Sequence, residues 1–241
     1  MIISHEHRYI FIKTQKTAGT SIELALSRYC GPRDVITPVT PEDEALRDSL
    51  GGRGPQNYHR PVRTTRDAAR FVLKRRRPDP FGNHSTATIV RGAVSKRIWR
   101  TYFKFCVERN PWDKTLSMWH FRNARRGPLS FDAYVMSNHL KGLSDWDRYA
   151  SDDQVHMDRV LRYEQLAEEL DEVRLELGLP EQLVLPRAKG HFRTDRRPYW
   201  ELIAPEHEER IAMVFVREIT HFKYQFRPDQ AARRAAEVSA R

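Results

Sequence analysis

Short apolar runs alternate along the chain with longer segments that have the spacing of helices. The first run lies in RYIFIK, residues 8–13, and predicts a buried strand. It leads through KTAGTS into SIELALSRY, whose apolar positions suit a packed helix closed by Gly31 and Pro32. The chain is therefore predicted to begin with a strand, a glycine-containing turn and a helix.

The same order returns twice. FKFCVERN predicts a second strand, and PWDKTLSMWHFRNA predicts the helix after it, with Pro111 at an early position where its missing N–H costs nothing. RVLRYEQL predicts a third strand, which leads into a helix that ends near Gly178 and Pro180. STATIVRGAVSKRIWRTY is also helical in pattern. Repeated strand–turn–helix units favour an α/β fold with a central parallel sheet flanked by helices.

Two regions depart from this order. Residues 37–84 are rich in proline, glycine and charge, with one short helical pattern in RDAARFVLKRRRPDP, and we interpret them as an insertion in a single domain of residues 1–228. A basic loop, PRAKGHFRTDRRPYWE, precedes a segment that predicts a C-terminal helix, APEHEERIAMVFVREITHFKYQF. Residues 229–241 form a tail to which we assign no function.

Charge and composition narrow the class of partner. The chain has 241 residues and a formal net charge of +10, which would steer anions such as nucleotides, polyanionic glycans or nucleic acid toward it. Cys30 and Cys106 are the only cysteines and lie far apart, so we expect a reducing compartment and no disulfide. The N-terminus lacks the features of a signal peptide, and no window approaches the roughly 20 apolar residues of a membrane span. Cytoplasm is the predicted location.

The turn after the first predicted strand has the chemistry of a phosphate site. N–H groups at a helix start, together with the positive end of the helix dipole, bind phosphate, and small residues let the backbone approach it. Lys16 adds a full positive charge, and Thr17, Thr20 and Ser21 add hydroxyl groups. The order GxxxxGK[ST] is absent, so this is not a Walker A sequence. A plain helix cap with a solvated lysine remains the alternative.

A second candidate phosphate site follows the second predicted strand. Arg109 ends that strand, and Ser117 lies two turns into the next helix, on a line that can face the same crevice. An arginine fork and a hydroxyl group at the carboxyl end of a parallel strand suit a second phosphate. An ordinary ion pair of Arg109 with Glu108 or Asp113 is the alternative.

Together, KTAGTS and RNPWDKTLS resemble the two nucleotide signatures of the sulfotransferase superfamily, and most closely those of its carbohydrate sulfotransferase branch, which is sulfotransferase family 2. The first motif of that branch often reads PKTGGTS, and the second reads RNPYDR with a serine downstream. This chain departs from them at Gln15, Ala18, Trp112 and Lys114. VLRYEQL and the closing HFKYQF also resemble the family, so the likeness covers most of the chain.

The resemblance implies a P-loop-like nucleotide-binding fold and a sulfuryl donor, 3′-phosphoadenosine 5′-phosphosulfate, which leaves as 3′-phosphoadenosine 5′-phosphate. The first motif would hold the 5′-phosphosulfate and the second the 3′-phosphate. The residues expected to bind the nucleotide are Lys16, Thr17, Ala18, Gly19, Thr20, Ser21, Arg109 and Ser117. The acceptor would be a hydroxyl group of a glycan or glycolipid, while a lipid, a peptide tyrosine and a small metabolite stay open. From their irregular composition, we expect residues 37–84 to shape the acceptor pocket.

In-line sulfuryl transfer needs a cation at the leaving oxygen and a base for the acceptor hydroxyl. Lys16 is our candidate for the cation and His84, which precedes a predicted helix, for the base. A helix-capping or exposed role for His84 stays open, with Asn83, Ser85, His59, Glu44 or Asp48 in its place. No His, Cys or carboxylate set has the spacing of metal ligands, and Asp152 with Asp153 suits a polar loop, so we expect no metal.

Two other classes of protein remain open. A P-loop kinase would use a similar phosphate site, but it would want GK[ST]. A polyanion-binding or nucleic-acid-binding protein would explain the charge but not the pair of phosphate motifs, so we expect no nucleic acid partner. Several basic residues could contact the nucleotide, the acceptor or a polyanion. They are Lys189, Arg193, Arg196 and Arg197, and those of the run KRRRP from Lys74 to Pro78.

Overall fold

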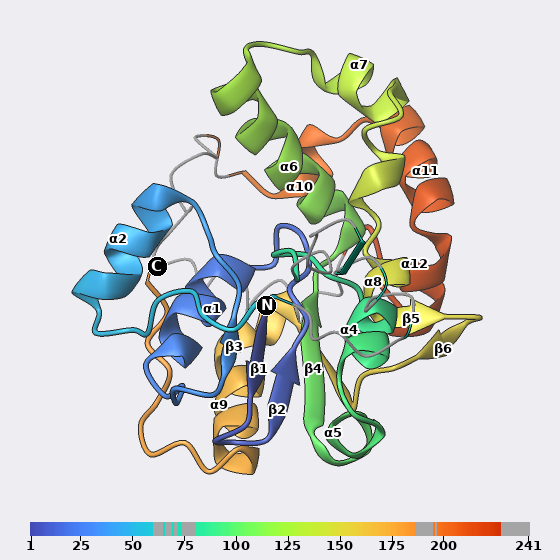
Figure 1. Cartoon of the computed structure of the whole chain (residues 1–241). Coiled ribbons are helices and arrows are strands. Elements are labelled where there is room, and N and C mark those ends of the chain that lie inside the picture. Colours follow the sequence, from blue (N-terminus) through green and yellow to red (C-terminus); the bar gives the residue numbers. More distant parts are fainter. Residues whose placement is uncertain are drawn as a thin grey trace.

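The computed structural model describes residues 1–59, 65, 69, 72–73, 81–186, 195 and 197–227. Five strands form its main sheet in the order β3-β1-β2-β4-β7 (Figure 1). They are β1 (Ile2–Ser4), β2 (Tyr9–Phe11), β3 (Val35–Ile36), β4 (Phe103–Glu108) and β7 (Arg159–Arg162). β2, β4 and β7 are parallel, whereas β1 pairs antiparallel with both β2 and β3. The α/β fold with a mostly parallel central sheet is thus confirmed.

Short helices and one hairpin surround the sheet. The helices are α1 (Gly19–Ser27), α2 (Pro41–Ser49), α4 (Ala87–Ala93), α5 (Lys96–Thr101), α6 (Pro111–Arg126), α7 (Phe131–Met136), α8 (Trp146–Tyr149), α9 (Leu166–Glu176), α10 (Tyr199–Leu202), α11 (Pro205–Val214) and α12 (Val216–Phe222). Two 3-10 turns, η1 (Lys141–Leu143) and η2 (Tyr163–Gln165), and the hairpin of β5 (Ala150–Ser151) and β6 (Gln154–Val155) complete the elements.

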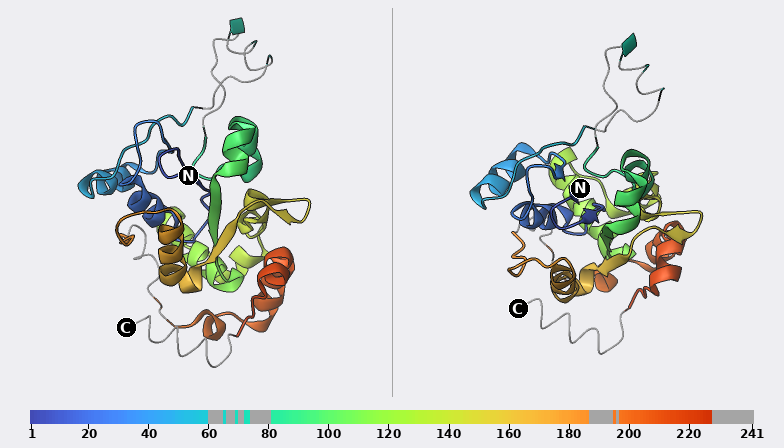
Figure 2. Two further views of the ribbon diagram at one scale, coloured as in Figure 1. Left: turned by 90° about the horizontal axis from the view of Figure 1, so that it is seen from below. Right: turned by 60° about the horizontal axis from the view of Figure 1, so that its bottom comes forward.

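Alternate residues of the central strands face two separate cores. Tyr9 and Phe11 of β2 pack with α1 and α9 on one face of the sheet. Ile10 of β2 and Cys106 of β4 pack on the other face, with α4, α6, α8, α11 and α12. Figure 2 shows the sheet between these two groups of helices. Helices on both faces explain why these strands are apolar at nearly every position rather than at every second one.

Some predicted boundaries were wrong. α1 ends at Ser27, before Gly31. The helical pattern of residues 85–102 is divided into α4 and α5, because Ser95 caps the second helix by accepting a hydrogen bond from the N–H of Ile98. The predicted C-terminal helix is likewise divided, at Phe215. Most of the helical pattern in RDAARFVLKRRRPDP, and residues 229–241, lie outside the described residues.

The strands β1 and β3 and the helix α2 were missed. The two strands have only three and two residues, too few for a clear period. α2 lies within the irregular stretch, although Thr40 and Pro41 are a good start signal: the Thr40 hydroxyl caps the Asp43 N–H, and proline is the first helical residue. In the part of the chain that the structure covers, no helix is long and apolar enough to cross a membrane.

A buried group of charges lies at the end of β4. The Lys114 ammonium is 2.7 Å from both Glu108 Oε1 and Asp145 Oδ2, and all three side chains are at most 1% exposed. The Tyr149 hydroxyl donates to Glu108 Oε2 at 2.9 Å. Burial raises the pKa of Glu108 to about 7, although Lys114 acts in the opposite direction. The group ties β4 to α6 and to the start of α8.

Lys114→Met should destabilise the protein by about 3–5 kcal/mol, because buried Glu108 would lose its cation and buried Asp145 one of its two. Arg217→Met is the control, since Arg217 and its partner Asp147 are exposed and should contribute less than about 1 kcal/mol. Urea unfolding of both variants measures the difference, and a loss for Lys114→Met no larger than that of the control would contradict the assigned role.

Candidate nucleotide site

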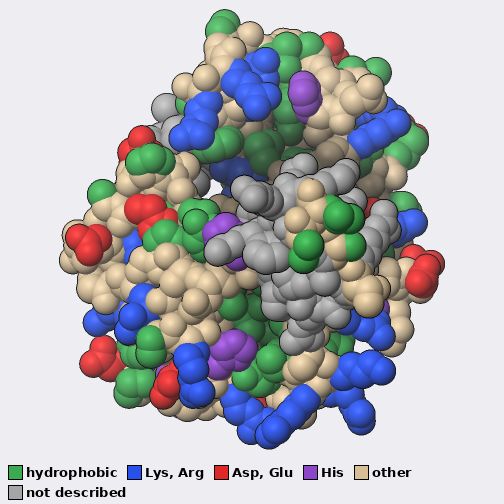
Figure 3. All heavy atoms as spheres, viewed as in Figure 1, with side chains coloured by type: hydrophobic (Ala, Val, Ile, Leu, Met, Phe, Trp, Pro, Cys, Tyr) green, Lys and Arg blue, Asp and Glu red, His purple; other side chains and the backbone are tan. Residues whose placement is uncertain are grey.

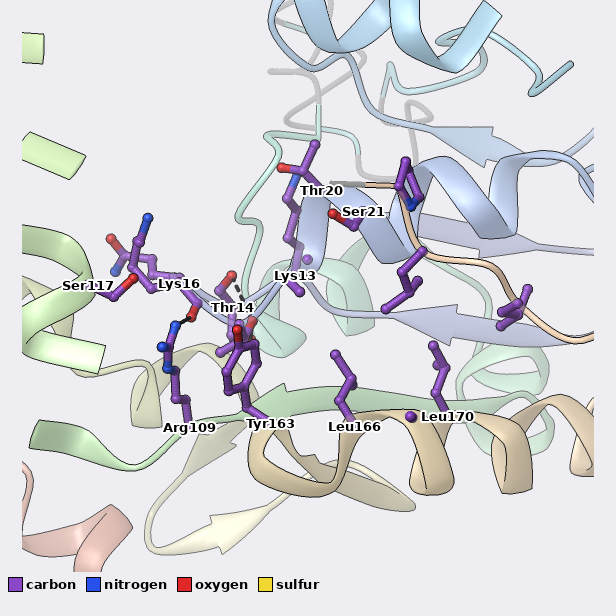
Figure 4. Close-up of a pocket in the computed structure, with 18 of the residues that line it drawn as sticks. Lys13, Thr14, Lys16, Thr20, Ser21, Arg109, Ser117, Tyr163, Leu166 and Leu170 are labelled. Carbon is purple, nitrogen blue, oxygen red and sulfur yellow. Dashed lines mark hydrogen bonds between the residues drawn. The ribbon is translucent and has the colours of Figure 1, made fainter. Parts of the chain in front are cut away.

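A cavity of about 870 Å³ lies at the carboxyl ends of β2, β4 and β7. This edge of a parallel sheet is where α/β folds bind nucleotides. Its walls come from the loop after β2, from α6, from α9 and from the segment around residues 182–186 (Figure 4). In the surface view of Figure 3, Lys and Arg side chains gather over the C-terminal part of α6, where Arg125 and Arg126 occupy the last turn.

The loop from Lys16 to Ser21 has the backbone shape of an anion site. Lys16 and Ala18 have φ angles of 59° and 58°, in the left-handed region, and left-handed residues are a feature of turns whose backbone N–H groups bind an anion. Ile22 donates the first hydrogen bond of α1, to the Ala18 carbonyl at 3.1 Å. The first N–H groups of a helix have no partner within it, and Gly19, Thr20 and Ser21 all line the cavity.

Gly19 is required by close packing. A Cβ atom at this position would lie 2.7 Å from Lys13 Cγ and 3.4 Å from the Thr14 carbonyl oxygen. Lys13 cannot easily move, because its ammonium is buried 2.7 Å from Glu23 Oε2. Glu23 is fully buried and also accepts from the Thr37 hydroxyl and the Met1 amine. The loop therefore packs against the buried ion pair of Lys13 and Glu23.

Arg109 joins the two predicted phosphate sites. Its guanidinium donates to the Lys16 carbonyl at 2.8 Å and to Asp113 Oδ2 at 2.7 and 2.9 Å. It also lies 4.0 Å from the ring centroid of Tyr163. The ion pair with Asp113, which the sequence left as an alternative, is thus present, but Arg109 is only 8% exposed and lines the cavity. Figure 4 shows it at the same end as Lys16 and Ser117.

Lys16 rests on an aromatic side chain that the sequence analysis missed. Its ammonium is 4.3 Å from the ring centroid of Phe121, close enough for a cation–π interaction. Phe121 lies one helical turn after Ser117 and also lines the cavity. That i, i+4 spacing from Ser117 was the signal available in the sequence. Lys13, at the end of the first predicted strand, was also missed.

His84 lines the cavity and has a defined tautomer. Its Nδ1 is 2.9 Å from the Lys13 carbonyl oxygen. A carbonyl oxygen can only accept, so Nδ1 carries the proton and Nε2 keeps its lone pair. Burial lowers the pKa of His84 to about 4, against the hydrogen bond to the Lys13 carbonyl, which raises it, and the charges of Lys13 and Arg148 lower it further. The imidazole is therefore neutral at pH 7 and able to accept a proton at Nε2.

The structure brings all of the predicted site residues into this one cavity. They are Lys16, Thr17, Ala18, Gly19, Thr20, Ser21, His84, Arg109 and Ser117. Asn83 lines it as well, whereas Glu44 pairs with Arg47, and Ser85 accepts from the Gly82 N–H. Arg197 pairs with Asp195. Lys189, Arg193, Arg196 and the run Lys74 to Pro78 lie outside the described residues.

The opposite wall of the cavity is mainly apolar, although Asp171 and Gln182 also line it. Leu166 and Leu170 of α9 and Leu183 and Leu185 of the following segment contribute to it. One end of the cavity is therefore cationic and the other suits a flat apolar group, which is the division expected for a nucleotide. Among the residues that the structure describes, no three His, Cys, Asp or Glu side chains are grouped to hold a metal ion. Cys30 and Cys106 are both buried and unbridged.

A family model, one curated protein and one solved structure are similar to this chain, and the family model identifies its family. The family model described as "Sulfotransferase family" matches residues 1–225. An uncharacterized protein of Archaeoglobus fulgidus is 33% identical over 102 residues, which are 40% of this chain and 85% of that protein. Among solved structures, mouse sulfotransferase SULT7A1 complexed with PAP matches with a TM-score of 0.49 at 14% identity, over 99% of this chain and 90% of that one.

Gly19→Ala should weaken the binding of 3′-phosphoadenosine 5′-phosphate at least tenfold, because the new Cβ forces the loop away from Lys13. Gly92→Ala, within α4, is the matched control: nothing lies within 4 Å of its new Cβ, and affinity should stay unchanged. Calorimetric titration compares the two variants. Equal affinities would mean that the tight contact at Gly19 does not shape the site.

Proposed function

The chain belongs to the sulfotransferase family, and we propose that it transfers a sulfuryl group from 3′-phosphoadenosine 5′-phosphosulfate to a hydroxyl group of a carbohydrate. The observation that carries this proposal is that both phosphate motifs and a neutral histidine line a single cavity. A protein that binds polyanions without reaction would have no use for a histidine with a free Nε2 beside a phosphate loop.

In this proposal the donor lies along the cavity from the cationic to the apolar end. The N–H groups of Gly19, Thr20 and Ser21 hold the 5′-phosphosulfate, aided by the Lys16 ammonium. Arg109 and Ser117 bind the 3′-phosphate, the group that distinguishes this nucleotide from AMP. The adenine packs on Leu166, Leu170, Leu183 and Leu185. The cavity, at about 870 Å³, lies within the roughly 300–1,000 Å³ usual for ligand pockets.

The reaction is an in-line displacement at sulfur. The acceptor hydroxyl attacks the sulfuryl group and passes its proton to His84 Nε2, while the bond from sulfur to the 5′-phosphate oxygen breaks. Negative charge builds on that leaving oxygen, and Lys16 stabilises it. The hydrogen bond from His84 Nδ1 to the Lys13 carbonyl fixes the ring that receives the proton. Products are the sulfated acceptor and 3′-phosphoadenosine 5′-phosphate.

Support for a carbohydrate acceptor comes from the motifs and from the surroundings of the cavity. KTAGTS and RNPWDKTLS resemble the carbohydrate branch of the family more than its other branches. The acceptor would enter near His84 and α6, whose last turn carries Arg125 and Arg126. A glycan or a glycolipid headgroup offers hydroxyl groups that fit this scheme. The cytoplasmic location and the single domain of residues 1–228 stay predictions.

Transfer of radiolabelled sulfate from the donor to a panel of acceptors tests the proposal. Oligosaccharides should be labelled, and His84→Ala should lower kcat by about 10²- to 10⁴-fold while the affinity for 3′-phosphoadenosine 5′-phosphate is unchanged. His139→Ala, which removes an exposed histidine, is the control and should retain full activity. Labelling of tyrosine peptides or small phenols alone would refute the carbohydrate acceptor. Full activity in His84→Ala would refute the assigned base.

A further inference from the structure

We propose that Arg148, held by Asp145, is a positioning residue that keeps His84 aligned with the phosphate loop. The inference rests on the proposed function of His84 as the base. Neither Arg148 nor Asp145 stands in the two nucleotide motifs. Arg148 is also absent from the lining of the cavity, so it would act through His84 rather than on the nucleotide or the acceptor.

Asp145 gathers donors from three parts of the site. This fully buried carboxylate accepts from the Gln15 backbone N–H at 2.7 Å, directly before Lys16 in the phosphate loop. It accepts from Lys114 of α6, also at 2.7 Å, and from the Arg148 guanidinium. The Gln15 side chain adds a bond to the Gly142 carbonyl at 2.9 Å. Asp145 thus fixes the positions of the phosphate loop, α6 and Arg148 relative to one another.

Arg148 connects Asp145 to the proposed base, His84. Its Nη1 donates to the His84 backbone carbonyl at 2.8 Å, while its Nε binds Asp145. The His84 ring bonds in turn to the Lys13 carbonyl. His84 is consequently fixed at its backbone through Arg148 and at its ring through Lys13, and both connections lead back to residues 13–15.

The position of His84 depends on these two hydrogen bonds. It lies in a turn before α4 and not within a helix or strand, so regular backbone pairing does not set its position. Reactions that depend on alignment are sensitive to small shifts, since a displacement of about 1 Å can cost on the order of 100-fold in rate. A planar guanidinium that binds a carboxylate and a carbonyl together is better suited to this than a single ammonium group.

Substitution of Arg148 is the cleanest test, because replacing Asp145 would also remove one of the two carboxylates that bind Lys114 and the acceptor of the Gln15 N–H. Arg148→Ala should lower kcat about tenfold, with the affinity for 3′-phosphoadenosine 5′-phosphate unchanged within about twofold. Arg148→Lys should recover part of the loss, since an ammonium can bind Asp145 or the His84 carbonyl but not both as a fork. Asp147→Ala is the matched control on α8, because it removes only an exposed pair with Arg217, and kcat should not change.

A double-mutant cycle separates positioning from general support of the fold. His84→Ala keeps the backbone carbonyl that Arg148 binds, so the double variant differs from it only in the guanidinium. If Arg148 acts through the His84 ring, Arg148→Ala should have almost no further effect on the residual rate in that background. An equal tenfold loss in both backgrounds, or a joint loss of nucleotide affinity, would overturn the inference.

Failure of the inference and failure of the proposed function give different results. Full activity in Arg148→Ala, with His84→Ala strongly impaired, refutes the positioning role and leaves the base in place. Absence of sulfuryl transfer by the unmodified protein refutes the proposed function itself. If the residual rate of His84→Ala is too low to measure, the kcat values of the other variants decide. The inference is supported if kcat is highest for the unmodified protein, intermediate for Arg148→Lys and lowest for Arg148→Ala. Any other order contradicts it.

Discussion

The site depends on the burial of one carboxylate, Asp145, among donors that come from distant parts of the chain. A buried charge is costly unless it is paired and hydrogen-bonded, and Asp145 meets this condition only when the loop after β2, α6 and α8 are all in place. Separation of these segments would leave Asp145 buried without its donors, and this energetic cost keeps the segments together. Lys114 shares its charge with Glu108, which extends the same constraint to the end of β4.

The position of the cavity follows from the sheet. β2, β4 and β7 are parallel, so their carboxyl ends meet at one edge, and the segments that leave them supply Lys16, Arg109 and Tyr163. The Arg109 guanidinium bonds to the Lys16 carbonyl and lies on the Tyr163 ring, which joins all three segments directly. Two segments that are predicted to bind phosphate, 93 residues apart in sequence, thus line one cavity. This arrangement suits a nucleotide with phosphates on both sides of its ribose.

The sequence predicted the three parallel strands, the helices after them and the residues that line the cationic part of the cavity, because those features are local. An apolar run, a proline in a first turn or a run of small hydroxyl residues can be recognised within a few positions. Asp145 and Arg148 could not be assigned in this way. Their roles depend on contacts with Gln15 and His84, which are far away in the chain, and nothing in SDWDRYA marks a residue of the site. β1 and β3 were missed since their apolar runs, MII and VI, are shorter than the YIFI that marks β2.

The central claim is that one nucleotide spans both phosphate motifs, and calorimetric titration with 3′-phosphoadenosine 5′-phosphate and with AMP tests it most directly. The account predicts that the unmodified protein binds the first ligand much more tightly, and that Arg109→Ala lowers its affinity by about 10- to 100-fold and removes most of its preference over AMP, because the guanidinium binds the 3′-phosphate. Any loss of AMP affinity should be much smaller, because AMP loses only the support that Arg109 gives the Lys16 carbonyl. Equal affinities for the two ligands, or an equal loss of both in Arg109→Ala, would contradict the account.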